Sequence, residues 1–206
     1  MITYLVSFTL SYTIAIAGAS GGLGRELVYQ SLNNDLDVIG ITRLSKTVTY
    51  PYREGGLEET FGKTEIISDP NLSVVQVSDL SGNEEYDSLV VCMSGKPFES
   101  DVSHKTCQTL CETLPESCKN ICLVSAWGVG DSIKYANPGI VAMKNWYLKS
   151  VYESKRIQEE IVTKKATEKN LPCLVLRPKV LSYGNTIVPS TPREKLASEI
   201  LEWCLI

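Results

Sequence analysis

The chain has 206 residues, which is enough for one domain with a sizeable core. Its formal net charge of −4 and its pI near 5.2 argue against a nucleic-acid-binding protein, because such proteins usually present a basic stripe. The hydrophobic content of 43% is ordinary for a globular protein, and the sequence contains no internal repeat or low-complexity tract.

The N-terminal residues 1–24 contain no charged side chain, so a signal or membrane segment must be considered. A secretory signal needs a positive n-region, which residues 1–11 lack. A spanning helix would have to include the glycine-rich turn that follows, so a membrane segment is not favoured. We expect an N-terminal extension or extra strand over 1–11, one domain over 12–206, and a cytoplasmic location.

The segment Ile14–Gly24, with the sequence IAIAGASGGLG, is the most informative part of the chain. An apolar run leads into Gly18-x-x-Gly21-x-x-Gly24, and a helix-forming stretch follows it. A buried strand, a glycine turn and a helix N-terminus in this order predict a dinucleotide site. The alternative is a flexible loop, since such loops also collect glycines. The expected cofactor contacts are Gly18, Ala19, Ser20, Gly21, Gly22, Leu23 and Gly24.

Short apolar runs alternate with helical patterns along the rest of the chain, as is typical of strands buried on both faces of a parallel sheet. The expected strands are Thr13–Ala17, Asp37–Ile41, Val74–Val77, Ser88–Met93, Asn120–Ser125 and Cys173–Leu176. The expected helices are Arg25–Leu32, Leu57–Phe61, Asp101–Thr113, Lys144–Asn170 and a closing helix with a capping box at Thr191–Glu194 and Pro192 as its first residue. This order predicts an α/β fold, a single Rossmann-type doubly wound domain with a mostly parallel sheet of about six strands flanked by helices.

The second expected strand ends at Thr42 and Arg43, about 20 residues past the glycine turn, where NAD-selective sites usually place an acidic residue. A guanidinium at this position can bind a 2′-phosphate through charge-assisted, bidentate hydrogen bonds. The sequence therefore favours NADP(H) over NAD(H), with Thr42 and Arg43 as cofactor contacts. The alternative is a solvated cation on a loop.

Further candidates follow the later strands. Asp79–Leu80 would contact the adenine, and Ser94–Gly95 would run beside the cofactor ribose. Ser125 ends the fifth expected strand, so its hydroxyl would face the crevice. Lys155 lies about 30 residues further on, in a helix, where it could hold the nicotinamide ribose. The alternatives are ordinary turn residues and a surface cation.

The sequence contains seven cysteines, an odd number that favours free thiols in a reducing compartment. Cys107 and Cys111 are spaced like metal ligands, as are Cys118 and Cys122. However, the first pair lies in an expected helix and Cys122 lies in an expected strand, while His104 is the single histidine of the sequence. We expect buried thiols and no metal site.

Together these residues make the sequence resemble the short-chain dehydrogenase/reductase superfamily, in particular its atypical, nitrogen-regulator-like NAD(P)H-binding branch. The resemblance rests on the GASGGLG turn, the candidates after the later strands, Arg177–Pro178 in LVLRPKVL, and the closing helix. It implies an NAD(P)-binding oxidoreductase with Ser125 and Lys155 in the active site and Pro178 beside the nicotinamide.

The sequence departs from this superfamily at one catalytic position. In Tyr-x-x-x-Lys both side chains lie on one helix face, but four residues before Lys155 the chain has Val151. Tyr152 is rotated by about 100° from that position, so it approaches the site only if the helix is displaced. The expected catalytic residues are therefore Ser125, Lys155 and Tyr152. Members of the branch that lack the tyrosine include flavin or quinone reductases and redox-sensing regulators.

These observations lead to the hypothesis of an NADP(H)-dependent oxidoreductase that reduces a small electron-poor acceptor, such as a flavin, quinone or carbonyl compound. The acceptor would bind over a crevice lined by Ser94, Trp127, Tyr135 and Trp146. The alternative is a non-catalytic NADP(H)-sensing regulatory or scaffold protein. A sugar-nucleotide epimerase is less favoured, because the short segment after Arg177 leaves no room for a substrate lobe. Monomer and homodimer both stay open.

Overall fold

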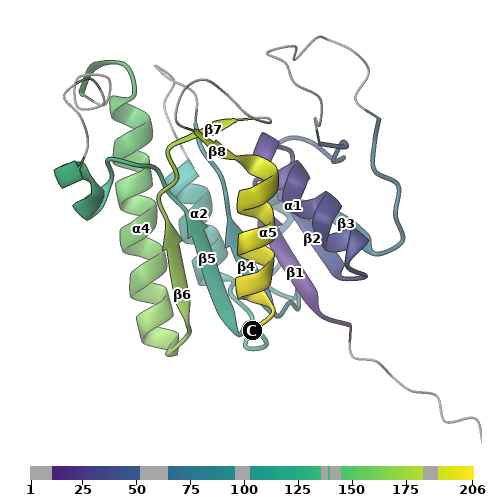
Figure 1. The fold of residues 1–206 in the computed structure, drawn as a ribbon. Coiled ribbons are helices and arrows are strands. Elements are labelled where there is room, and N and C mark those ends of the chain that lie inside the picture. Colours follow the sequence, from purple (N-terminus) through teal and green to yellow (C-terminus); the bar gives the residue numbers. More distant parts are fainter. Residues whose placement is uncertain (1–10, 52–64, 96–102, 136–138, 140–144, 183–189) are drawn as a thin grey trace, which may run out of the picture.

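The computed structural model describes residues 11–51, 65–95, 103–135, 139, 145–182 and 190–206. Its main sheet is six-stranded and parallel, with the order β3-β2-β1-β4-β5-β6 (Figure 1). These strands are β1 (Thr13–Ala17), β2 (Asp37–Thr42), β3 (Leu72–Gln76), β4 (Ser88–Val91), β5 (Asn120–Val124) and β6 (Cys173–Leu176). The chain moves outward from β1 to β3 and then crosses back to β4, so the order reverses between β1 and β4. This topology confirms the expected doubly wound α/β fold.

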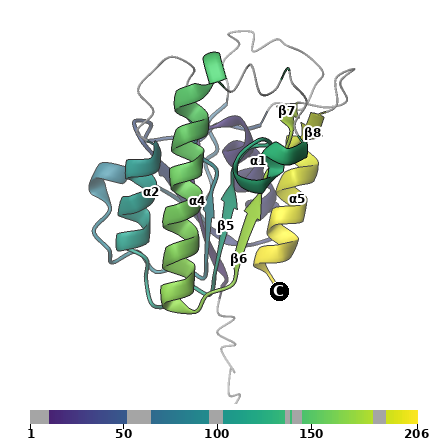
Figure 2. The ribbon, with the colours of Figure 1, turned by 90° about the vertical axis from the view of Figure 1, so that its left-hand side faces the viewer.

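Helices cover both faces of this sheet. Helices α1 (Gly22–Asn33) and α5 (Arg193–Cys204) pack together on one face, whereas α2 (Ser103–Glu112) and α4 (Lys149–Lys169) pack together on the other. Figure 2 shows α4 and α5 on opposite sides of β5 and β6. A separate parallel pair, β7 (Val180–Ser182) and β8 (Ser190–Pro192), precedes α5. Two 3-10 turns, Val77–Asp79 and Gly130–Tyr135, follow β3 and β5.

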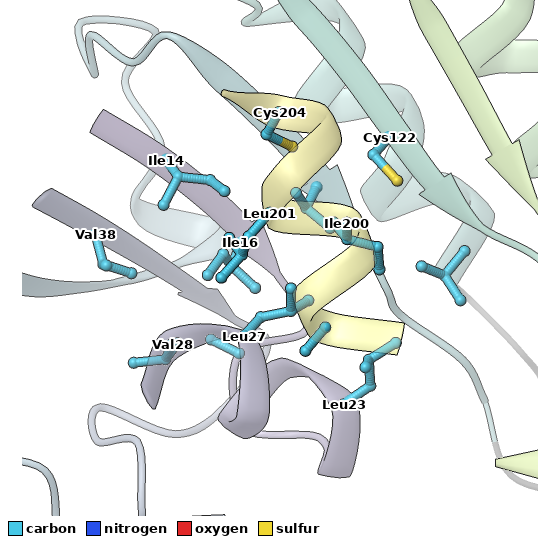
Figure 3. Packing of buried hydrophobic residues seen from close by; sticks show 14 of the residues in the cluster. Ile14, Ile16, Leu23, Leu27, Val28, Val38, Cys122, Ile200, Leu201 and Cys204 are labelled. Carbon is cyan, nitrogen blue, oxygen red and sulfur yellow. The ribbon is translucent and has the colours of Figure 1, made fainter. Parts of the chain in front are cut away.

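Strand β1 divides the core into two clusters, because successive side chains of a strand point to opposite faces. Ile14 and Ile16 lie in the cluster under α1 and α5, where they pack with residues such as Leu27 and Ile200 (Figure 3). Ala15 and Ala17 lie in the cluster under α2 and α4. All four β1 residues named here are completely buried, as expected for a central strand covered on both sides.

Some strands begin or end at other residues than the apolar runs predict. The expected strand Val74–Val77 begins earlier and ends earlier, because Val77 starts a 3-10 turn in which its carbonyl accepts from the Leu80 amide. Strand β2 continues through Thr42, which pairs with Gln76 of β3. Strands β4 and β5 end at Val91 and Val124, so Met93 and Ser125 follow the strands instead of lying in them.

The helix boundaries also show corrections. Helix α1 begins at Gly22, three residues earlier than expected, because the Arg25 amide already donates to the Gly21 carbonyl at 2.9 Å. The capping box is wrong: Pro192 is the N-cap of α5, and no side chain caps this helix in the described part of the chain. Thr191 lies one residue before the N-cap, in β8, where it pairs with Leu181.

Several expectations fall outside the described residues. They are the extra strand over 1–11 for all but its last residue, the helix Leu57–Phe61, and the first residues of the expected helices Asp101–Thr113 and Lys144–Asn170. Among the helices that the structure describes, none is long and apolar enough to cross a membrane.

Candidate dinucleotide-binding site

The glycine turn between β1 and α1 has a backbone that requires glycine. Gly18 has a φ of 95°, and its amide donates to the Ile41 carbonyl of β2 at 2.9 Å. A Cβ atom at Gly18 would lie 3.2 Å from the main chain of Cys92, and one at Gly24 would lie 2.1 Å from the Gly18 carbonyl oxygen. Side chains are therefore excluded at both positions, and the turn packs closely against the ends of β2 and β4.

The N-terminus of α1 opens beside this turn. Gly21 is the N-cap in an extended conformation, and in the described residues no side chain caps it. The first turn of the helix also contains no acidic residue. The amides of this turn and the positive end of the helix dipole are therefore available to an anion.

A cavity of about 260 Å³ lies in front of the glycine turn; we call it the switch-point cavity. Its lining residues are Gly18, Ser20, Gly21, Ile41, Arg43, Leu44, Ser45, Cys92, Met93 and Ser94. These residues come from the carboxyl ends of β1, β2 and β4, where the strand order reverses. Open α/β sheets bind their ligands in this crevice. The geometry fits a dinucleotide, because Gly18 and Gly24 keep the turn free of side chains at two positions where a pyrophosphate would approach the main chain.

The loop after β2 presents a cation to this cavity. Arg43 is exposed and forms no ion pair with any residue that the structure describes. Thr42 is buried, and its hydroxyl donates to the Ser45 carbonyl, while the Gln76 side chain donates from Nε2 to the Leu44 carbonyl at 2.8 Å. These bonds fix the backbone on both sides of the guanidinium. Thr42 therefore shapes the loop, and Arg43 faces the cavity.

The predicted adenine and ribose contacts fall partly on the cavity. Ser94 is exposed and lines it, and Gly95 follows directly. Asp79 is exposed in the 3-10 turn after β3, where its carboxylate accepts from the Ser78 hydroxyl at 2.9 Å. Leu80 is half-buried against the core under α2 and α4. Neither Asp79 nor Leu80 belongs to the lining that the described residues give this cavity.

Lys155 lies inside the protein, directly behind the cavity wall. The residue is only 4% exposed, so it is not a surface cation. Its ammonium donates to the carbonyls of Met93 at 2.5 Å and Val124 at 2.7 Å. Met93 lines the cavity and Val124 precedes Ser125, so the lysine joins the main chain at the ends of β4 and β5.

Ser125 is the first residue after β5, and it is only 5% exposed. Its amide donates to the Leu176 carbonyl at 2.7 Å, whereas its buried hydroxyl has no hydrogen-bond partner in the part of the chain that the structure describes. An unsatisfied buried hydroxyl is unfavourable and is uncommon in folded proteins. A bound ligand at the crevice is one way to supply the missing partner.

Tyr152, an expected catalytic residue, follows the position of the missing tyrosine and is bonded to the loop after β5. Val151 is buried, and the Tyr152 hydroxyl donates to the Trp127 carbonyl in the loop after β5 at 2.8 Å. Burial raises the pKa of Tyr152 above its usual value. The phenol is thus bonded to the main chain of this loop and holds its proton more strongly than a free tyrosine.

The end of β6 contributes an ion pair that the sequence analysis did not anticipate. Arg177 donates from Nε and Nη2 to the two carboxylate oxygens of Glu159 on α4, at 2.8 and 2.7 Å. Gly130, with a φ of 55°, packs over this pair, since a Cβ there would lie 2.9 Å from Arg177 Nη2. The carbonyl of Pro178, the expected nicotinamide neighbour, accepts a hydrogen bond from the Trp127 backbone amide at 2.9 Å. The pair and this bond together support the loop after β5.

The spacing along α4 contained a signal for this pair. The buried residues of the helix include Val151, Lys155, Glu159, Val162 and Ala166, which recur at intervals of three and four. Two of these five residues are charged, so an apolar pattern does not reveal that this face of the helix is buried. Glu159 lies four residues after Lys155, on the same face of the helix. A search for residues on the face of Lys155, instead of a search for apolar residues, would have identified it.

The three aromatic residues expected at the crevice have different environments. Trp127 is half-buried, and the Lys179 ammonium lies 5.8 Å from its ring centroid. Tyr135 and Trp146 are 76% and 81% exposed. Trp127 is therefore the one of the three that is built into the loop after β5.

All seven cysteines are free thiols, and five of them are buried. Cys92 lines the switch-point cavity, and its thiol donates to the Ala17 carbonyl at 3.2 Å. Burial raises the pKa of Cys92 to about 12, so its thiol is protonated at neutral pH. Among the described residues, no three histidine, cysteine or acidic side chains are grouped as metal ligands.

The sequence matches no protein-family model and no curated protein. Solved structures do resemble the chain. One is ChuY, an anaerobillin reductase from Escherichia coli O157:H7, with a TM-score of 0.62 and 16% identity over 92% of this chain and 89% of that one. The chain therefore shares the α/β fold of this structure.

Two further structures support this assignment of the fold. The oxidoreductase ylbE from Lactococcus lactis has a TM-score of 0.64 and 18% identity, over 94% of this chain and 84% of that one. A wide-type short-chain dehydrogenase/reductase from Veillonella parvula, solved with NADP, has a TM-score of 0.59 and 16% identity, over 93% and 86%. The fold implied by the sequence resemblance is therefore confirmed.

Proposed function

We propose that the chain is an NADP(H)-dependent oxidoreductase that reduces a small electron-poor acceptor. The observation that carries this proposal is the switch-point cavity, in which a glycine turn, an open helix N-terminus and Arg43 face the same space. The Veillonella structure was solved with NADP, and two other similar structures are described as a reductase and an oxidoreductase. These descriptions support a nicotinamide cofactor and redox chemistry for this chain.

The preference for NADP(H) rests on Arg43. A carboxylate at this position would repel a 2′-phosphate, whereas a guanidinium can bind it with two parallel hydrogen bonds. The hydrogen bonds that Thr42 and Gln76 donate hold the loop backbone in place before the cofactor arrives. A preformed loop loses less conformational entropy on binding, and this strengthens the interaction.

The cofactor, when bound, supplies a hydride from its nicotinamide ring. Negative charge then develops on the acceptor, and two groups of this chain can stabilise it. The Ser125 hydroxyl, which has no hydrogen-bond partner among the described residues, donates a hydrogen bond to the acceptor. The Lys155 ammonium lies behind the same strand ends as a fixed positive charge.

The acceptor takes its proton from water in this scheme. Val151 offers no proton, and the Tyr152 hydroxyl is bonded to the Trp127 carbonyl. Flavins and quinones form reduced states that water can protonate, so they suit this arrangement better than a carbonyl compound that needs a positioned acid. Trp127 would lie on the acceptor side of the crevice.

The hydrogen bond of Tyr152 favours a second function, that of a regulatory or scaffold protein. Because the phenol of Tyr152 is bonded to the main chain, the chain could bind NADP(H) and regulate or assemble with a partner without turnover. Such a protein would keep the cofactor site and need no acceptor.

The first experiment is calorimetric titration of the purified protein with NADPH and NADH, followed by quinone and flavin oxidation assays on the same sample. We expect NADPH to bind more tightly than NADH and turnover to occur with at least one acceptor. Tight binding without turnover across the panel would favour the regulatory protein. Absence of binding to either nucleotide would contradict the assignment of the cavity.

A further inference from the structure

A network of hydrogen-bonded, buried polar side chains connects Lys155 to the interface between α2 and α4. Gln158, one helical turn after Lys155, is completely buried, as is Ser103 at the start of α2. The Gln158 amide donates from Nε2 to the Ser103 hydroxyl at 2.6 Å. Ser103 and Ser154 are 3.0 Å apart at their hydroxyl oxygens, and the Ser154 hydroxyl lies 3.2 Å from Nδ1 of His104.

The lysine decides which end of the Gln158 side-chain amide faces it. An ammonium can only donate, so the carbonyl oxygen Oε1 faces it at 3.4 Å, and Nε2 donates to the Ser103 hydroxyl on the other side. The negative end of the amide dipole is therefore directed at the positive charge. This contact is longer than the two bonds to the main-chain carbonyls and is therefore weaker. Its main effect is to orient the ammonium, and it adds little binding energy.

Burial of the amide needs an explanation beyond packing. A completely buried glutamine loses its hydration and recovers stability only through hydrogen bonds, so an apolar residue of similar volume would stabilise the α2–α4 interface at least as well. The hydrogen bonds of Gln158 lead to Lys155 on one side and to Ser103 on the other. Orientation of the lysine is therefore what the amide adds.

The position of the lysine matters because it joins two walls of the crevice. One of its acceptors, the Met93 carbonyl, belongs to a residue that lines the switch-point cavity. The other, the Val124 carbonyl, belongs to the residue before Ser125. A shift of the ammonium would move its positive charge away from the bound electron acceptor. It would also weaken the hydrogen bonds that hold the ends of β4 and β5 together.

We propose that Gln158, with its side chain held in place by the hydrogen bond to Ser103, is a positioning residue for Lys155 in the reductase reaction. This inference rests on the proposed function. Gln158 acts through Lys155 and touches neither cofactor nor acceptor. It extends the site from the carboxyl edge of the sheet to helix α2.

The test is a double-mutant cycle between Gln158 and Lys155. The variants are Gln158→Leu, Lys155→Met and the double variant, each assayed for kcat and KM with a quinone acceptor and for NADPH binding by calorimetry. Gln108→Leu is the matched control, since Gln108 lies on the exposed side of α2 and bonds to Glu112. Circular dichroism and thermal unfolding show that each variant is folded.

We expect Gln158→Leu to lower kcat about tenfold, with KM for the quinone and the affinity for NADPH changed by less than about threefold. In the Lys155→Met background the same substitution should have no further effect on kcat. The control should match the unsubstituted protein.

Two results would overturn the inference, and they are distinct from a failure of the proposed function. A kcat for Gln158→Leu equal to that of the control would show that Lys155 needs no positioning by the amide. Equal losses in both backgrounds would show that Gln158 acts independently of Lys155. If the unsubstituted protein turns over no acceptor, the proposed function fails first, and this inference falls with it.

Discussion

The two halves of the site are built by different means. In the first half, β1, the glycine turn, α1 and the loop after β2 present mostly main-chain groups, and Arg43 is the one charged side chain in the described lining of the cavity. In the second half, β5, α4 and β6 bring together side chains that bond to distant main-chain groups, such as Lys155 and Tyr152. Main-chain sites depend on where glycine stands, whereas side-chain sites depend on packing between elements far apart in the sequence.

Gly24→Ala tests the first half most severely. The new Cβ would lie 2.1 Å from the Gly18 carbonyl oxygen, so the turn and α1 must separate. We expect the loss of all measurable NADPH binding and a decrease of roughly 3 kcal/mol in the free energy of unfolding. Calorimetry and urea unfolding measure the two effects. Asn33→Ala, at the exposed end of the same helix, is the control, and equal losses in both variants would contradict the steric explanation.

Arg43→Ala sharpens the assignment of the 2′-phosphate. Removing the guanidinium should weaken NADPH binding by about one to two orders of magnitude, as expected for charge-assisted hydrogen bonds, and should leave NADH binding nearly unchanged. Titration of both nucleotides with the same preparation measures the difference. Lys46→Ala, a nearby exposed cation, serves as the control. Equal weakening for NADPH and NADH would place the arginine elsewhere on the cofactor.

Ser125→Ala examines the second half without disturbing the first. The hydroxyl is buried and has no partner among the described residues, so its removal should not lower stability. We expect kcat with a quinone to fall about tenfold while the Kd for NADPH stays the same. Steady-state kinetics and calorimetry distinguish these quantities. Unchanged turnover would remove Ser125 from the reaction.

Asp87→Asn is expected to have the smallest effect, and it acts at the opposite end of the sheet. Burial raises the pKa of Asp87, but hydrogen bonds from Lys119 and from the Thr13 amide lower it more, so the net pKa lies below its usual value. A depressed pKa in the folded state contributes stability above the unfolded pKa of about 3.9, and this contribution disappears as the pH falls through the lower folded value.

The substitution should therefore cost about 1 kcal/mol at pH 7, and the difference from the unsubstituted protein should shrink as the pH falls below about 4. Urea unfolding at several pH values measures it. NADPH binding should not change, because Asp87 lies just before β4, at the amino end of the sheet. A difference that persists unchanged at low pH would contradict the ionic explanation.

The sequence predicted most of the fold and the main-chain half of the site. Apolar runs located all six strands of the main sheet, and the spacing of Gly18, Gly21 and Gly24 located the turn, because these features are local. The boundaries at Val77 and Thr191 were missed, since hydrophobicity does not show whether a backbone enters a 3-10 turn or pairs in a second small sheet.

The side-chain half could be predicted only in part. Lys155 was predicted as a candidate from its spacing after Ser125, but its bonds to Met93 and Val124 depend on how α4 packs on the sheet. Gln158 and Glu159 were overlooked in a helix whose composition looks solvated. Their partners, Ser103 and Arg177, lie on other elements, and no local pattern in the sequence relates them.

The placement of α5 has a consequence for how the protein is made. This last helix supplies Leu196, Ile200 and Leu201 to the core over β1 and α1, and the Cys204 carbonyl accepts from the Tyr12 hydroxyl at 2.5 Å. During synthesis, the apolar face of β1 and α1 is therefore covered only after residues 193–204 have left the ribosome. The nascent protein passes through a stage in which the nucleotide turn has been made but half of its core is open to water, and that stage is when it is most exposed to aggregation and to chaperones.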